Sequence, residues 1–161
     1  MSLHRIDFGR MPDTPPRSEA DWYPFNKGGG YRNWYGNGEF VVHYERDGQV
    51  LIDLVTEKYP RISDPEFVIK NRRHYFNEAI TYTSVSSMYF GVRFMPQGSI
   101  FSVAGPVALV SDDMLHICLC FLCSKLATEF ISAINPTIGF QGADVGKLPI
   151  ANESLQKHKL E

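Results

Sequence analysis

The sequence predicts an α+β fold, a twisted and mainly antiparallel sheet with one long helix and shorter elements packed on it. Runs rich in β-branched and aromatic residues, such as 39–44 and 80–85, are typical of strands. Residues 88–95 alternate between two faces, and an amphipathic strand of this kind needs a covering layer. Leucines at steps of three and four over about 113–134 predict the helix that provides it.

Composition predicts one soluble domain with a core of its own. The chain has 161 residues, of which 43% are hydrophobic and 13% aromatic. Its formal net charge of -2 excludes a global basic field, so any binding of nucleic acid must come from a local patch. No apolar run reaches membrane-spanning length, and we expect no membrane partner.

The ends differ in composition from the centre. Residues 1–20 are polar and proline-rich, which predicts a flexible N-terminal segment or linker. Residues 21–150 are predicted to form the folded domain, and 151–161 a polar tail whose final Leu-Glu pair resembles a cloning remnant.

Within the domain, residues 39–44 and 80–85 are predicted strands, and 50–55 a second strand or an irregular edge. Residues 88–95 and 99–104 predict a hairpin that turns at Pro96-Gln97-Gly98. The long helix ends at Asn135-Pro136.

A stretch from Asp21 to Asn37 combines six aromatic residues with four glycines, two cations and three asparagines. Two interpretations are open. The glycines suit a tight hairpin whose aromatic side chains are core, or the mixture suits a nucleic-acid surface that binds phosphates and stacks bases.

A second basic cluster lies at 69–78, where the alternative is an ordinary solvated face. Arginine reads guanine and asparagine reads adenine, so Asn33 is the candidate base reader, with a turn role as its alternative. The candidate DNA-contact residues are Lys27, Arg32, Asn33, Trp34, Tyr35, Arg72, Arg73 and Arg93.

No catalytic or metal site is predicted in this chain. Cys118, Cys120 and Cys123 crowd into one apolar run, which favours buried, reduced thiols and a cytoplasmic location over a zinc or redox site. Asn135-Pro136-Thr137 only partly matches the Asn-Pro-Pro-aromatic motif of amino-methyltransferases, and no glycine loop suits S-adenosylmethionine.

Motifs occur in order along the chain at 23–29, 31–37, 75–82, 90–94 with 96–101, 122–125, 135–141, 144–145 and 148–150. Together they resemble segments of large adenine-specific DNA methyltransferases of bacterial restriction-modification and BREX phage-exclusion systems. The set spans nearly all of 21–150, with departures at Tyr82, Pro106 and Gly142-Ala143.

The resemblance implies a TaqI-like target-recognition domain. It would grip double-stranded DNA and contact the catalytic domain of the same chain, which flips and methylates adenine with S-adenosylmethionine. This chain alone would hold no cofactor and have no activity. Two alternatives remain, a docking domain without DNA contact, which the net charge favours, and a single-strand-binding module with aromatics exposed on one sheet face.

Overall fold

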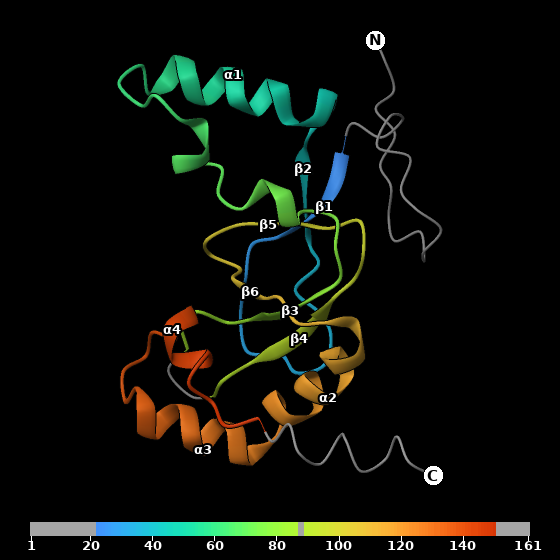
Figure 1. Cartoon of the computed structure of the whole chain (residues 1–161), viewed down its shortest axis with the longest axis vertical. Helices are drawn as coiled ribbons and strands as arrows, with labels where there is room; N and C mark the ends of the chain where they lie inside the picture. Colours follow the sequence, from blue (N-terminus) through green and yellow to red (C-terminus); the bar gives the residue numbers. More distant parts are fainter. Residues whose placement is uncertain (1–21, 87–88, 151–161) are drawn as a thin grey trace.

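The computed structural model describes residues 22–86 and 89–150. It confirms the predicted α+β class, with two small sheets stacked along the long axis of the molecule and helices at both ends (Figure 1). The segments predicted as a linker (1–20) and a polar tail (151–161) lie outside the described residues.

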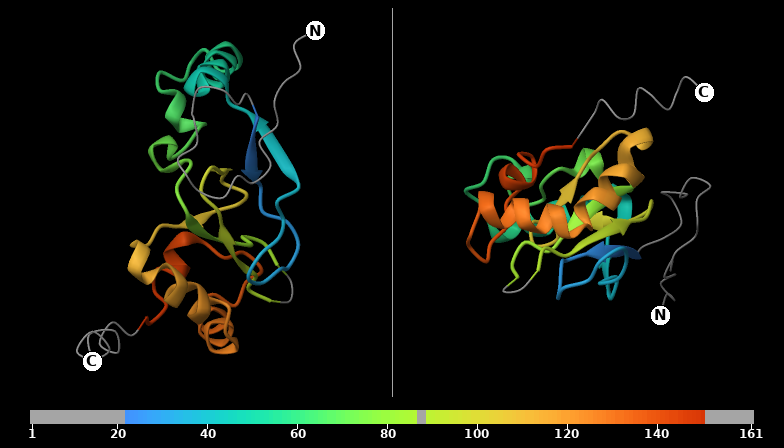
Figure 2. Two further views of the ribbon diagram at one scale, coloured as in Figure 1. Left: turned by 90° about the vertical axis from the view of Figure 1, so that its right-hand side faces the viewer. Right: turned by 90° about the horizontal axis from the view of Figure 1, so that it is seen from below.

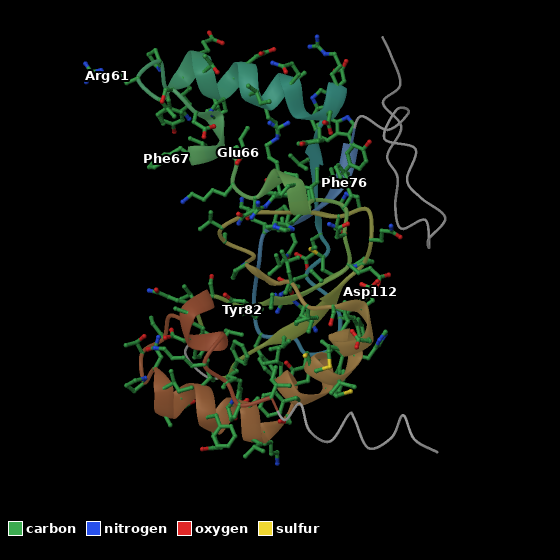
Figure 3. The ribbon with its side chains drawn as sticks, in the orientation of Figure 1. Arg61, Glu66, Phe67, Phe76, Tyr82 and Asp112 are labelled. Carbon is green, nitrogen blue, oxygen red and sulfur yellow. The ribbon has the colours of Figure 1, made fainter. Side chains whose placement is uncertain are left out.

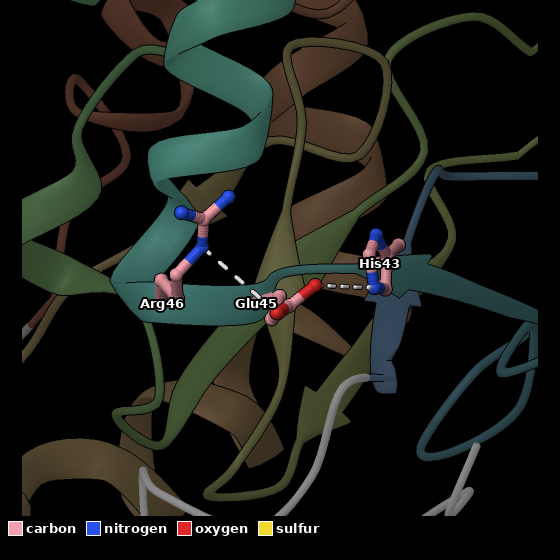
Figure 4. Close-up of polar contacts among 3 residues, drawn as sticks. All are labelled: His43, Glu45 and Arg46. Atoms are coloured by element: carbon pink, nitrogen blue, oxygen red, sulfur yellow. Dashed lines mark ion pairs between the residues drawn. The ribbon is translucent and has the colours of Figure 1, made fainter. Parts of the chain in front are cut away.

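The first sheet has the order β2-β1-β5. β1 (Trp22–Asn26) pairs antiparallel with β2 (Phe40–His43), which confirms the strand predicted at 39–44. β5 (Ile100–Phe101) joins the other edge of β1 in parallel. Beyond β2 the chain makes a surface turn in which Glu45 forms ion pairs with His43 at 3.5 Å and Arg46 at 3.9 Å (Figure 4).

Short helices cap this end of the molecule. They are α1 (Gln49–Lys58) and three 3-10 turns, η1 (Glu45–Gly48), η2 (Pro65–Phe67) and η3 (Arg72–His74). The strand or irregular edge predicted at 50–55 is wrong, because these residues form the middle of α1. Gly48, at a φ of 82°, turns the chain into the helix, and Gln49 donates to Asp53 one turn later.

The second sheet has the order β4-β3-β6 and is antiparallel throughout. Its strands are β3 (Ala79–Tyr82), β4 (Val92–Met95) and β6 (Val107–Ala108). The strand predicted at 80–85 is therefore present. The predicted hairpin of 88–95 with 99–104 is wrong, because β4 pairs with β3 while β5 belongs to the first sheet. Backbone bonds between Phe76 and the turn at Gly98 and Ser99 direct the chain away from β4.

The predicted single helix at 113–134 is two helices, α2 (Asp112–Leu122) and α3 (Lys125–Ile134), which meet at 81°. Ser124 breaks the helix because its hydroxyl accepts from the Ala127 amide and caps α3. The break also shifts the buried stripe. Ala127 and Ile131 face the core in α3, whereas Leu126 and Phe130 of the predicted stripe are 54% and 36% exposed.

Each sheet packs its own core. α2, α3 and the short α4 (Gly142–Val145) cover one face of the second sheet, where the core is mostly aliphatic (Figures 1 and 2). The core near the first sheet is mostly aromatic, and edge-to-face ring contacts join Tyr23, Tyr44, Tyr75 and Phe76.

The three cysteines are free, but their burial differs. Cys118 is buried and Cys123 half-buried, whereas Cys120 is exposed, so the expectation that all are mostly buried is wrong for Cys120. In the part of the chain that the structure describes, no single helix is long and apolar enough to cross a membrane. Only α2 and α3 taken together, across their bend, reach that length and composition.

Candidate nucleic-acid interface

The connection between β1 and β2, residues 27–39, lies against the second sheet. It descends from β1, runs along the outer edge of β4 and returns to β2 (Figure 2). The Trp34 amide donates to the Val92 carbonyl at 2.8 Å, and the Phe94 amide donates to the Trp34 carbonyl at 2.9 Å. These two bonds make Trp34 a one-residue extension of the sheet.

Glycines allow this connection to pass close to its neighbours. Gly28 has a φ of 79°, and a Cβ there would clash with the Ala104 carbonyl oxygen. A Cβ on Gly91 would lie 3.0 Å from the Arg32 carbonyl oxygen. Trp34 itself has a φ of 74°, which is rare for a bulky residue, and its two backbone bonds to β4 hold it there.

The aromatic residues of this connection are on the surface. Tyr31 and Trp34 are each 48% exposed and Tyr35 is 80% exposed. Tyr89, 50% exposed, packs its ring against Tyr31 with centroids 5.3 Å apart. The tight-hairpin interpretation with core aromatics is therefore wrong for these residues. We call Tyr31, Arg32, Trp34, Tyr35 and Tyr89 the aromatic face.

Tyr89 is not among the site residues that the sequence predicts. Its alternation with Gly91 and Arg93 is visible in the sequence, but nothing there places it against Tyr31, which is far away along the chain. The exposed rings lie beside the edge of β4 and not across a sheet face. Every residue of β3 is buried, and in β4 only Phe94 is half-buried, so neither strand offers an exposed face.

Asn33 is bonded at both ends of its amide. Its Oδ1 accepts from the Val92 amide at 2.9 Å, and its Nδ2 donates to the Tyr31 hydroxyl at 3.1 Å. These bonds belong to the turn role that the sequence left open as an alternative. The base-reading role of Asn33 stays a prediction, and it would require the amide to leave both partners.

The predicted cations fall into separate groups. Arg32 is exposed within the aromatic face, and exposed Lys27 lies over the ring of Phe40 at 5.3 Å. Arg72 donates to the Tyr44 hydroxyl at 3.4 Å, the main cause of the raised pKa of its guanidinium. Arg73, exposed, donates to His74. Among the residues that the structure describes, no hydrogen bond or ring contact joins Arg72 or Arg73 to 27–37.

Arg93 needs a correction, because its side chain has no exposed surface and is not on the molecular surface with the other predicted contacts. It points from β4 into the layer beneath the connection. Its Nη1 donates to the Thr83 hydroxyl at 2.8 Å and to the Arg32 carbonyl at 3.4 Å. Burial lowers the pKa of the guanidinium. Strand alternation correctly set Arg93 opposite Val92 and Phe94, but it could not tell that both faces are covered.

The Asn135 motif has a structural role here. Its Nδ2 donates to the Gly139 carbonyl at 2.8 Å and the Asp144 carboxylate at 2.7 Å, while its Oδ1 accepts from Thr137. These bonds tie the end of α3 to the start of α4. Among the described residues, no group of three or more His, Cys, Asp or Glu side chains could hold a metal ion.

No family model matches this chain. It is 32% identical over 157 residues to the adenine-specific methyltransferase PglX of Lacticaseibacillus casei (strain Zhang). It is also 33% identical over 156 residues to the adenine-specific methyltransferase BrxX of Escherichia coli O9:H4 (strain HS). These alignments cover 94% and 92% of this chain but only 13% and 12% of the two relatives.

Proposed function

We propose that this chain is the DNA target-recognition part of an adenine-specific DNA methyltransferase of a phage-exclusion or restriction-modification system. The similarity to two adenine-specific methyltransferases over nearly the whole chain supports the enzyme class. The small share of each relative that it covers is consistent with a part that carries no catalysis. In this proposal S-adenosylmethionine is bound, and adenine methylated, by a catalytic domain elsewhere in the enzyme.

The aromatic face is the observation that supports DNA recognition. Three rings and the exposed Arg32 lie on a connection that β4 holds in place, and a fourth ring, Tyr89, packs on Tyr31 from the segment before β4; all four rings are about half or more exposed. Rings of this kind stack on bases or sugars, and arginine binds phosphates or the edge of guanine. Soluble proteins normally bury most such aromatic area, so a group of exposed rings marks a binding surface.

The test is binding of the chain to duplex DNA, followed by fluorescence anisotropy. We expect weak affinity without the catalytic domain, roughly 10⁻⁴ to 10⁻⁶ M at physiological salt. Arg32→Gln should weaken binding and reduce the slope of log K against log salt by about 0.9, because one phosphate contact is lost. Arg61→Gln is the matched control, because Arg61 is also exposed but lies at the far end of the α1 region, by which we mean α1 with the neighbouring 3-10 turns, residues 45–74 (Figure 3).

Trp34→Ala with Tyr35→Ala should weaken binding at least several-fold, and Tyr59→Ala, which removes an exposed ring next to α1, should not. Selection from a random duplex library should enrich one sequence motif. Equal affinity and salt slope for the Arg32 and Arg61 variants, with no enriched motif, would contradict the proposal.

A docking role toward the catalytic domain is the second candidate, and the α1 region favours it. No residue of α1 is fully buried, and Leu54 and Tyr59 expose 55% and 41% of their surface. Phe67, which follows in η2, exposes 70% (Figure 3). A groove of ≈ 690 Å³ lies beneath, between Leu51 and Ile69 on one side and the β5–β6 segment on the other. If docking is the role, Leu54→Ser with Phe67→Ser should abolish binding to a separately produced catalytic domain while DNA binding is retained.

A further inference from the structure

Arg93 has an unusual environment for a charged side chain. It is fully buried, and its Nε and Nη2 have no hydrogen-bond partner among the described residues. No ion pair includes it within 22–86 and 89–150. Buried cations in proteins are nearly always paired with a carboxylate, because an unpaired buried charge is strongly unfavourable. A side chain whose burial carries this desolvation penalty is expected to have a role beyond filling space.

The bonds that Arg93 does make lead to the aromatic face. Nη1 bridges Thr83, in the chain that leaves β3, and the carbonyl of Arg32, in the connection above. The next residues bond to β4 on both sides of Arg93. The Asn33 side chain and the Trp34 amide bond to the Val92 backbone, and the Trp34 carbonyl accepts from the Phe94 amide. Residues 32–34 are therefore held to β4 by two side-chain bonds, from Arg93 and through Asn33, and by two main-chain bonds at Trp34.

The Arg93 bond holds Arg32 itself, whereas the other bonds to β4 are made by Asn33 and Trp34, and the flanking segments are rich in glycine. Gly28, Gly29, Gly36 and Asn37 all have positive φ, and a Cβ added at Gly30 would meet no atom within 4 Å. Such a segment has many accessible conformations, and each bond that fixes it opposes a large entropy. Beneath it, the guanidinium also places an uncompensated positive charge close to Arg32, which favours the approach of an anion.

We infer that Arg93 is a positioning residue for the aromatic face: its buried guanidinium fixes the backbone at Arg32, so that Arg32 and Trp34 are held ready for DNA without Arg93 touching it. This role deepens the proposed DNA recognition and, for its effect on binding, depends on it. It differs from the surface contact that the sequence predicts for Arg93.

Trp34 offers a direct readout of the position of the connection. The chain has two tryptophans, so Trp22→Phe leaves Trp34 as the reporter. Three variants are made in that background. Arg93→Met keeps the approximate size of the side chain and removes the hydrogen bonds of the anchor. Arg93→Lys keeps the charge but lacks the forked guanidinium, and Thr83→Val removes the hydroxyl that accepts from Nη1. Arg72→Met is the matched control for the quenching measurement alone, because it removes an arginine that is bonded to Tyr44 outside the connection; Arg61→Gln remains the control for DNA affinity.

We expect quenching of Trp34 by acrylamide to rise about twofold or more in Arg93→Met and Arg93→Lys, and less in Thr83→Val. The melting temperature of Arg93→Met should not fall, since removing a buried charge removes its desolvation cost. A merely structural role predicts the opposite, a lower melting temperature. DNA affinity should fall several-fold with an unchanged salt slope, because no phosphate contact is lost.

Unchanged quenching in all three variants would overturn the inference, and so would a salt slope reduced by about 0.9, which would mean that Arg93 reaches a phosphate. If quenching rises as expected but the parent chain binds no duplex at any salt, the anchor stands and the proposed function fails. The two failures are therefore distinguishable.

Discussion

Some residues of the 27–39 connection are bonded to the rest of the fold, and others are exposed to solvent. Asn33 and Trp34 are fixed by bonds to Val92 and Phe94, whereas Tyr35 is 80% exposed. The buried Asn26 adds a bond at the start of the connection, where its Nδ2 donates to Thr81 at 2.6 Å and to the Gly105 carbonyl at 3.0 Å. The positions that build the surface and those available to a ligand are thus interleaved along the chain.

The three successive glycines are not equivalent. Gly28→Ala should destabilise the protein by at least about 1 kcal/mol, because its φ of 79° disfavours a Cβ and the methyl would meet the Ala104 carbonyl. Gly30→Ala is the matched control, since its φ is not positive and no atom lies within 4 Å of an added Cβ. Urea unfolding measures both. Equal losses at the two positions would contradict the described path of the connection.

At the scale of elements, α2 exposes its thiols unequally. Cys118 is buried, and burial raises the pKa of both Cys118 and Cys123. A thiol reagent applied to the folded protein should therefore label Cys120 quickly and the other two slowly. Cys120→Ser should remove the fast phase. Three equally fast phases would show that the packing of α2 is different.

The connection between α3 and α4 should respond to acid. The hydrogen bond from Asn135, followed by the Gln141 amide, lowers the pKa of Asp144. Because its pKa is lowered in the folded state, the ionised carboxylate stabilises the folded protein at any pH above the pKa of an unfolded aspartate, about 3.9. This stabilisation is lost as the pH falls through the lower pKa of the folded state. In urea unfolding between pH 6 and 2, the free energy of unfolding of Asp144→Asn should fall less with acid than that of the unmodified protein.

Asn135→Ala provides the matched comparison, since it removes the main cause of the shift and should flatten the same profile. If both variants lost as much free energy of unfolding at low pH as the unmodified protein, the link between α3 and α4 would carry no such stabilisation.

At the scale of the whole molecule, the two sheets divide the proposed tasks. The second sheet carries the aromatic face at its β4 edge, and α2 and α3 cover the opposite side (Figure 2). The first sheet carries α1, which exposes apolar residues to a partner (Figure 1). DNA recognition and docking would then use different surfaces of one chain, and both could operate in the same enzyme.

The chain by itself should neither bind S-adenosylmethionine nor methylate DNA, because the sequence holds neither a cofactor loop nor the complete base-holding motif. Titration calorimetry with the cofactor checks this, with an intact adenine-specific methyltransferase as positive control. Saturable binding in the micromolar range would contradict it and would place catalysis within this chain.

Local patterns in the sequence determined the α+β class, the strands at 40–43 and 79–82 and the presence of helix over most of 113–134. They also identified the glycine-rich stretch as the distinctive segment. These features depend on residue preferences and on periodicity over a few positions, which are properties of neighbours along the chain.

Only the tertiary structure decided which strands pair, where the long helix breaks and which arginines reach the surface. β5 pairs with the distant β1, where Ile100 lies beside Phe25, and not with its neighbour β4. Arg93 and Arg32 are both cations in aromatic surroundings, yet one is buried and the other exposed. Burial and strand pairing depend on contacts between residues that are far apart in the sequence. The alternation of residues along one strand therefore does not show whether its second face is also covered.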